Sequence, residues 1–397
     1  MGIVDSSTSS KEPLFTGSFL LLLGSSLLLQ IGMGVFYLFP LFVLEIGGNK
    51  ADIGILMGAM SLAAVFGRPW ISGLVDRIGR KRGLVIASLM LMMVSVIHLF
   101  FNGPIDQTFP FLLILRLIFG TGLAFSFVSG LSMAADLAPA SRLTEAIGYF
   151  GITPLIGIAL GPVVGEGLIH LWGFNTIFFA ALALFMSAFL SLVPMRDQFM
   201  RTPSVDTAVG DFFKVLRIPL VWRMTVICVC FGVAFAAHSS FVAPFAQKHA
   251  LSISAYFASY SVAAVFARIS GGYLANRFGE IQVMPAALVM AGVGFFSLIG
   301  VSTTAGLMGT GLLAGMGHGL LFPSLISVTL YPISANKRGK VNGALTGGFD
   351  AGVFAGALVM GQLGELFGFS TIFALAGAFI VLGFGIFFRI RPKIVRR

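Results

Sequence analysis

Charged residues are scarce in this sequence. Asp, Glu, Lys and Arg make up 10% of the 397 residues, whereas a soluble globular domain carries about 25%. A chain with 57% hydrophobic residues has too few polar groups to cover its surface, which excludes a soluble globular protein. The net charge of +10 does not indicate nucleic-acid binding, because the basic residues fall in short segments between apolar runs and near the C-terminus.

Cysteine is almost missing, and several functional motifs do not occur. Cys228 and Cys230 lie two positions apart on one predicted helix, so they cannot bridge each other, and no histidine completes a zinc pattern. The chain has no G-x-x-x-x-G-K-[ST] loop for ATP and no H-E-x-x-H pair. We therefore expect no ATP-driven pump, no enzyme, and neither a cofactor nor a metal.

What the sequence does contain is a series of long apolar segments. A transmembrane helix needs about 20 mostly apolar residues. Twelve segments qualify, although the last two merge around Gly364–Phe369, so eleven spans also fit. The candidate spans are 17–44, 51–75, 83–101, 109–135, 143–170, 173–194, 221–246, 254–275, 281–301, 306–331, 341–365 and 369–389.

The two halves of the chain repeat each other. After a shift of 200 positions, Phe66 and Arg68 fall on Phe266 and Arg268, and after a shift of 195, residues 173–178 fall on 368–373. Parallel repeats of six helices are typical of secondary transporters, whose substrate site lies near the membrane midplane between the halves. The predicted fold class is an all-α polytopic membrane protein with twelve helices in two pseudo-symmetric six-helix bundles: residues 1–194, a polar cytoplasmic connector at 195–220, and residues 221–397.

The basic residues predict the orientation. If both termini are cytoplasmic, twenty of the 25 Lys and Arg residues fall in cytoplasmic segments, and only Lys50 and Lys248 fall outside. We expect a multi-pass protein of the inner (plasma) membrane with both termini in the cytoplasm. The expected partners are membrane lipids, a small-molecule substrate and protons, with no nucleic acid, and we expect a monomer.

The loop between the second and third spans carries the most specific motif. Residues 72–81 read SGLVDRIGRK, which resembles the signature loop G-x-L-a-D-r-x-G-r-k of the major facilitator superfamily of transporters. Ser72 replaces the first glycine, and in the second half Asn276 replaces the acid. The resemblance implies a latch that holds the cytoplasmic side shut, formed by Asp76, Arg77, Gly79 and Arg80.

The fourth and fifth spans carry two further motifs in the family's order. Residues 116–124 read RLIFGTGLA and resemble the family motif R-x-x-q-G-x-g-a, with Phe119 in place of the usual polar residue. The resemblance links Arg116 to proton coupling or to pairing with Asp76, although a purely structural arginine fits as well. The fifth span resembles the antiporter motif g-x-x-x-G-P-x-x-G-g, which favours export by proton antiport, through Gly157, Gly161, Pro162 and Gly165.

Two acids are candidates for proton coupling. Asp350 lies about nine residues into the eleventh span, or about 13 Å from its cytoplasmic end. An acid at that depth is costly, which favours a functional role such as carrying a proton, while a hydrogen bond to a neighbouring helix is the structural alternative. Glu166 stands where the antiporter motif has its last glycine, near the outer end of its span, which favours a place at the membrane interface over a role in proton coupling.

Four further residues are candidates for the substrate cavity. His238 and His318 lie near the middle of their spans, where an imidazole can bind substrate, relay protons or make a helix contact. Gln30 and Tyr37 lie two turns apart on the first span. The sequence thus predicts a secondary active transporter, a proton-coupled exporter of an amphiphilic small molecule that works by alternating access. A symporter or facilitator for a small nutrient, or a lipid flippase, also fits.

Overall fold

The computed structural model describes residues 13–100, 103–195 and 214–395, and this part of the chain is helical throughout, without a strand. Twelve helical segments are long and apolar enough to cross a membrane. The helices of the first half are α1 (Gly17–Val35), α2 (Phe39–Glu45), α3 (Lys50–Ile78), α4 (Arg80–His98), α5 (Ile105–Leu137), α6 (Leu143–Trp172) and α7 (Asn175–Leu192). Those of the second half are α9 (Pro219–Lys248), α10 (Ile253–Phe278), α11 (Glu280–Ser297), α12 (Thr304–Leu330), α13 (Ala335–Phe367) and α14 (Phe369–Val395).

The prediction of twelve spans is confirmed, and the eleven-span alternative is wrong. Gly368 has a φ of 87°, a conformation that glycine adopts readily and that ends α13 before α14 begins. The first span is interrupted by the 3-10 turn η1 (Phe36–Leu38), so α1 and α2 together form one span. Two more 3-10 turns are η2 (Ala140–Arg142), in the connection between α5 and α6, and η3 (Leu298–Gly300), at the end of the span that begins with α11. Most of the predicted connector at 195–220 lies outside the described residues.

The sequence repeat is visible in the turns of the structure. Gly79, between α3 and α4, and Gly279, between α10 and α11, have φ values of 100° and 84°. Gly173 and Gly368 stand between the matching later helices with φ values of 83° and 87°. Because residues with a side chain rarely adopt this conformation, the glycines allow the same tight turn at equivalent places in both halves.

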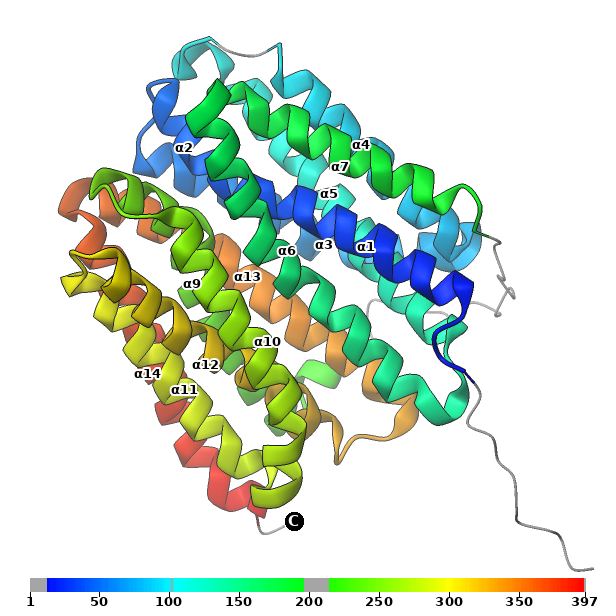
Figure 1. Ribbon diagram of the computed structural model, residues 1–397. Coiled ribbons are helices and arrows are strands. Elements are labelled where there is room, and N and C mark those ends of the chain that lie inside the picture. Colours follow the sequence, from blue (N-terminus) through cyan, green and yellow to red (C-terminus); the bar gives the residue numbers. More distant parts are fainter. Residues whose placement is uncertain (1–12, 101–102, 196–213, 396–397) are drawn as a thin grey trace, which may run out of the picture.

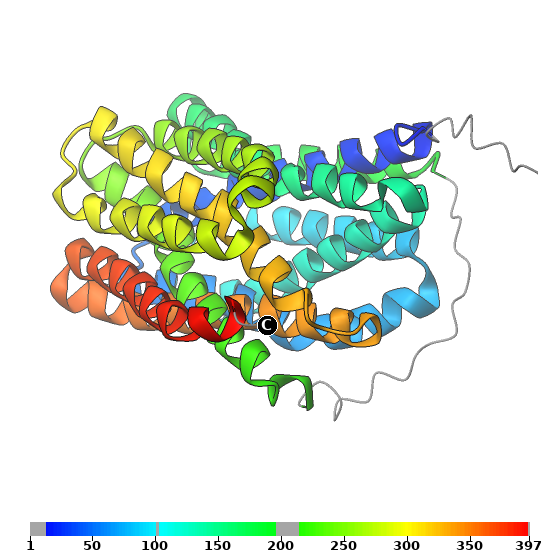
Figure 2. The same ribbon diagram turned by 90° about the horizontal axis from the view of Figure 1, so that it is seen from below.

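The helices form two bundles that lie side by side, one of α1–α7 and one of α9–α14 (Figures 1 and 2). The bundles meet where α3 packs against α13 and where α6 packs against α10. We call the end of the molecule where α1 begins and α14 ends the terminal side, and the opposite end the distal side. In Figure 1 the terminal side is at the lower right and the distal side is at the upper left.

Glycines allow close packing both within and between the bundles. A Cβ atom added to Gly161 of α6 would collide with the backbone of Gly34 in α1, and one added to Gly157 would collide with the backbone of Gln30. At the junction between the bundles, a Cβ on Gly54 of α3 would collide with the backbone of Ala357 in α13. Small residues let membrane helices approach until their backbones touch, so these glycines hold the helices at their observed spacing.

Candidate functional site

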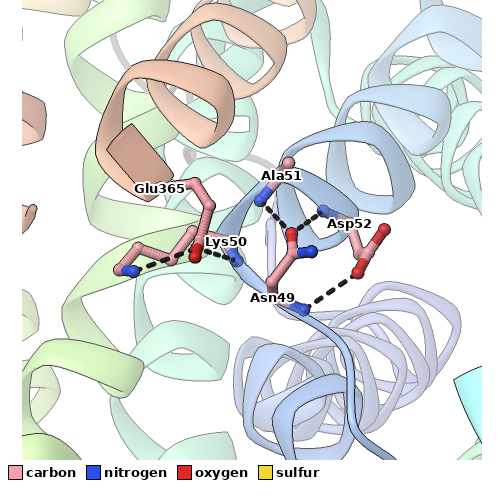
Figure 3. Close-up of polar contacts among 5 residues, drawn as sticks. All are labelled: Asn49, Lys50, Ala51, Asp52 and Glu365. Carbon is pink, nitrogen blue, oxygen red and sulfur yellow. Dashed lines mark hydrogen bonds and ion pairs between the residues drawn. The ribbon is translucent and has the colours of Figure 1, made fainter. Parts of the chain in front are cut away.

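The distal ends of the two bundles are joined by an ion pair. The Nζ of Lys50, at the start of α3, lies 3.0 Å from Oε2 of Glu365, near the end of α13. The same carboxylate accepts a hydrogen bond from the Lys50 backbone N–H at 3.0 Å (Figure 3). A capping box of Asn49 and Asp52 fixes the first turn of α3, which presents Lys50 to the other bundle.

Glu166 makes a second distal contact between the bundles. Its carboxylate accepts hydrogen bonds from the backbone N–H groups of Ile253 at 3.0 Å and Ser254 at 2.6 Å, at the start of α10. Unpaired N–H groups and the helix dipole make this a favourable place for a negative charge. Glu166 thus takes part in a distal contact between the bundles, and a role of Glu166 in proton coupling stays a prediction.

The middle of the molecule holds an ion pair between the bundles. Nη2 of Arg68, on α3, lies 2.8 Å from Oδ2 of Asp350, on α13. Both side chains are largely shielded, with exposures of 20% and 11%. The Arg68 guanidinium also lies 5.6 Å from the ring centre of Phe127, on α5. Because removing either partner leaves the other charge shielded and unpaired, this contact depends strongly on the ionisation of Asp350.

A pseudo-symmetric contact crosses the interface in the opposite direction. Arg268 of α10 occupies the position that matches Arg68 in the repeat, and its Nη1 donates a hydrogen bond of 2.8 Å to the backbone oxygen of Gly151, on α6. Arg68 thus reaches from the first bundle to the carboxylate of Asp350, whereas Arg268 reaches from the second bundle to the backbone carbonyl of Gly151. Both lie ten residues before the terminal-side end of their helix, at Ile78 and Phe278.

A buried cluster of histidines and tyrosines lies in the second bundle. The hydroxyl of Tyr260 and Nδ1 of His318 are 2.5 Å apart, and the hydroxyl of Tyr256 and Nδ1 of His238 are 3.1 Å apart. The His238 ring stacks on Tyr260, with centroids 4.0 Å apart and an angle of 25°. We call His238, Tyr256, Tyr260 and His318 the His–Tyr cluster. It joins α9, α10 and α12 through these two Tyr–His contacts, while Nε2 of His238 has no hydrogen-bond partner among the described residues.

Tyr37 brings the first bundle to this cluster. Its ring, on η1, lies edge-on to His238 with centroids 5.9 Å apart, and edge-on to Phe257 at 5.4 Å. Three of the four predicted cavity residues, Tyr37, His238 and His318, are therefore together in one place. The fourth, Gln30, lies on α1 against Gly157 of α6.

Arg116 lies elsewhere, inside the first bundle. It is fully buried, and its Cζ lies 3.4 Å from the ring centre of Phe39, 5.0 Å from that of Phe36 and 5.1 Å from that of Phe119. Within the described part of the chain, none of its guanidinium nitrogens has a hydrogen-bond partner. Cation–π contacts with three rings are therefore what stabilises this charge.

The predicted pairing of Arg116 with Asp76 is wrong. Arg116 lies in the distal half of α5, whereas Asp76 lies near the terminal-side end of α3, so about 30 Å of helix separates their levels. Asp76 instead pairs with Arg80 at 3.0 Å, and Arg80 lies 3.0 Å from Asp136, at the end of α5. The sequence could not show this, because it does not give the depth at which each residue lies.

Several residues of the signature loop contact other parts of the first bundle. Gly79 forms the turn between α3 and α4, and Lys81 donates to the backbone oxygens of Val193 at 3.1 Å and Met195 at 2.6 Å. Arg77 is exposed. In this conformation the loop therefore braces α3 and α4 against α5 and α7, and the expected role as a latch between the halves stays a prediction.

The antiporter motif packs α6 against the first span. In addition to Gly157 and Gly161, Gly165 approaches the side chain of Leu38, on η1. Pro162 lies inside α6, where it removes one backbone donor. The motif thus positions η1, which carries Tyr37 toward the His–Tyr cluster.

Four important side chains were missed as site residues by sequence reasoning. Arg68 and Arg268 were noted only as a matching pair in the repeat, and that match was the signal that could have singled them out. Tyr256 and Tyr260 lie four residues apart on α10, a spacing that places both on one helix face. Their contacts with His238 and His318 depend on the packing of three helices, which the sequence does not reveal.

Two bundles of six spanning helices, joined by contacts near their middle, are an architecture typical of membrane transporters. The sequence profile of the Major Facilitator Superfamily matches residues 14–330 and 249–397, and the chain belongs to this family. It is therefore a multi-pass membrane transporter and not an enzyme.

Individual relatives are distant. Multidrug resistance protein 1 of Bacillus subtilis (strain 168) is 24% identical over 360 residues, covering 89% of each chain. Multidrug resistance protein MdtG of Klebsiella pneumoniae (strain 342) is 24% identical over 358 residues, covering 86% of this chain and 85% of the relative. The crystal structure of a mutant of the nucleoside transporter NupG superposes with a TM-score of 0.80 at 15% identity, covering 94% of this chain and 99% of that one.

Proposed function

We propose that this protein exports amphiphilic small molecules from the cytoplasm in exchange for protons. The observation that carries the proposal is the ion pair of Arg68 and Asp350, an acid–base contact between the two bundles in the middle of the membrane span. A proton that binds Asp350 removes its negative charge and so weakens a link between the halves. Proton binding and rearrangement of the halves are thereby coupled through one contact.

The contacts of this conformation fit one state of such a cycle. The distal side is joined by Lys50 with Glu365 and by Glu166 with the start of α10, and Asp350 holds Arg68 as an ionised carboxylate would. With the terminal side in the cytoplasm, as the basic residues predict, this is the deprotonated state that accepts substrate from inside. Protonation from outside would follow once the distal contacts open.

The relatives support export and an amphiphilic substrate. Two of the similar proteins are named for multidrug resistance. The His–Tyr cluster and the surrounding Phe231, Phe235 and Phe257 present aromatic faces with few charges, which suits a partly apolar compound. The inner membrane is the location that this function requires.

Transport into proteoliposomes tests the proposal. Purified protein is reconstituted with an acid interior, and a panel of aromatic amphiphiles is added while a trapped pH-sensitive dye reports the interior pH. We expect at least one compound to accumulate and to raise the interior pH as protons leave. Accumulation without any proton movement would instead indicate a facilitator or a flippase.

A further inference from the structure

The two arginines that cross the bundle interface differ in what they meet. Arg68 meets the carboxylate of Asp350, whereas Arg268 meets only the carbonyl of Gly151. In the first half, the position that corresponds to Asp350 after a shift of 195 is Leu155, which cannot neutralise a charge. Within the described part of the chain, no acid forms an ion pair with Arg268, and its Nε has no hydrogen-bond partner.

A neutral residue could make the same contact with Gly151. A carbonyl oxygen needs only an N–H donor, and a glutamine side chain supplies one without bringing a charge into the membrane. A guanidinium is costly at this depth unless an anion compensates it. The contact with Gly151 therefore explains why a hydrogen-bond donor is needed at position 268, but not why that donor is charged.

The surroundings of Arg268 fit an aromatic anion. Tyr260, Ala264 and Arg268 follow one another at intervals of four residues on α10 and so share one helix face. Long side chains on a helix point toward its N-terminus, which directs the guanidinium toward Tyr260. The hydroxyl of Tyr260 in turn contacts Nδ1 of His318, so the helix face that carries Arg268 leads to the His–Tyr cluster.

The guanidinium of Arg268 is not fully enclosed. Arg268 is only partly buried, unlike the fully buried Arg116. A Cβ atom on Gly151 would lie 3.2 Å from Nη1 of Arg268, so glycine at this position leaves room for the guanidinium. An incoming carboxylate or sulfonate makes a stronger, charge-assisted hydrogen bond to arginine than a carbonyl does.

We propose that Arg268 binds the anionic group of the exported compound and that the His–Tyr cluster holds its aromatic body. The substrate class is thus an aromatic amphiphile with one carboxylate or sulfonate, a refinement that rests on the proposed export function. The anion replaces the Gly151 carbonyl and breaks the link between α6 and α10. Substrate then releases the inter-bundle contact of Arg268, and the proton releases that of Arg68.

A matched pair of fluorescent probes tests this assignment. 8-Anilinonaphthalene-1-sulfonate and N-phenyl-1-naphthylamine share an aromatic scaffold, and only the first carries an anionic group. Each probe is titrated against the full-length protein in nanodiscs of neutral lipid, with empty nanodiscs as background and no ion gradient. We expect the sulfonate to bind at least tenfold more tightly than the neutral amine.

Substitutions separate an anion site from a structural role. We expect Arg268→Gln to weaken sulfonate binding at least tenfold and to leave binding of the neutral amine within twofold, while Arg268→Lys keeps most of the sulfonate affinity. Arg277→Gln, which makes the same change nine residues along α10 beside Tyr273, serves as the matched control and should bind both probes like the wild type. Retained binding of the neutral amine also shows that Arg268→Gln is folded.

Three results would overturn the assignment. These are equal affinity of the wild type for both probes, equal weakening of both probes by Arg268→Gln, and no saturable binding of either probe. Because binding is measured at equilibrium without a gradient, a failure of proton coupling in proteoliposomes leaves this result unaffected. The two proposals can therefore fail separately.

Discussion

Nη2 of Arg68 and Oδ2 of Asp350 lie 2.8 Å apart, although the two residues belong to different bundles and lie 282 positions apart in the sequence. Both groups are largely shielded from solvent. A contact of this kind is sensitive to the loss of either charge, because the remaining charge stays shielded and unpaired. The stability of the protein therefore depends on this pair, and under the proposed mechanism proton coupling depends on it as well.

A double-mutant cycle separates these two effects. We expect Arg68→Gln alone and Asp350→Asn alone each to destabilise the protein by about 3 kcal/mol, because each leaves one unpaired charge. The double variant leaves a neutral pair that can still hydrogen-bond, so it should recover most of this loss while remaining uncoupled. Thermal unfolding in detergent measures the effect. A double variant less stable than both single variants would contradict the pairing.

Glu166→Gln is expected to weaken the distal closure. The carboxylate accepts two N–H groups at the start of α10, and hydrogen bonds to a charged group contribute about 1.5–3 kcal/mol. The population of distal-open protein should rise about tenfold.

A cysteine at Ala357 of α13, which is buried where this helix packs against Gly54 of α3, reports that opening through its reaction with a water-soluble maleimide. Cys228 and Cys230 are first replaced by serine. Asp106→Asn, at an exposed position, is the control. Unchanged labelling in Glu166→Gln would argue against a closing role.

Gly161→Ala is expected to destabilise the first bundle by about 1–3 kcal/mol, because the added methyl group meets the backbone of Gly34. Gly148→Ala is the matched control on the same helix, since no atom lies within 4 Å of the added Cβ, and alanine favours the helix by about 1 kcal/mol. Thermal unfolding should show a lower stability than the wild type for Gly161→Ala and a higher stability for Gly148→Ala. Equal stability would contradict close packing of α1 and α6.

Asp76→Ala is expected to slow exchange without abolishing substrate binding. The side chain links to Arg80 and, through it, to Asp136, so its loss loosens the terminal ends of α3, α4 and α5. Turnover should fall several-fold while the dissociation constant for a transported compound stays within about twofold. Loss of binding in a variant that expresses normally would contradict a role in switching.

The fold was predictable because its determinants are local. Apolar runs of about 20 residues require membrane helices, and the glycine turns at Gly79 and Gly279 recur at one offset. The repeat then predicts two equivalent bundles. The helices extend beyond the predicted apolar spans, and these additional helical residues were not predictable. For example, α13 begins at Ala335, within a polar stretch where hydrophobicity gives no signal.

The site was predictable only in part, because its contacts depend on depth and on packing between distant helices. Asp350 and His318 stood out as polar residues in apolar spans. Their partners, Arg68 and Tyr260, come from helices far away in the sequence. The error for Arg116 has the same origin, because a resemblance between motifs gives the residue type but not the level at which a partner lies.

The most direct test of the account is proton movement by the Asp350→Asn variant. Proteoliposomes with an acid interior receive a compound that the wild type transports, and a trapped dye reports the interior pH. We expect the variant to bind the compound and to exchange it down its own gradient, but to move no protons. The control Asp106→Asn should behave like the wild type. Proton movement at the wild-type rate by Asp350→Asn would contradict the central claim that Asp350 carries the proton.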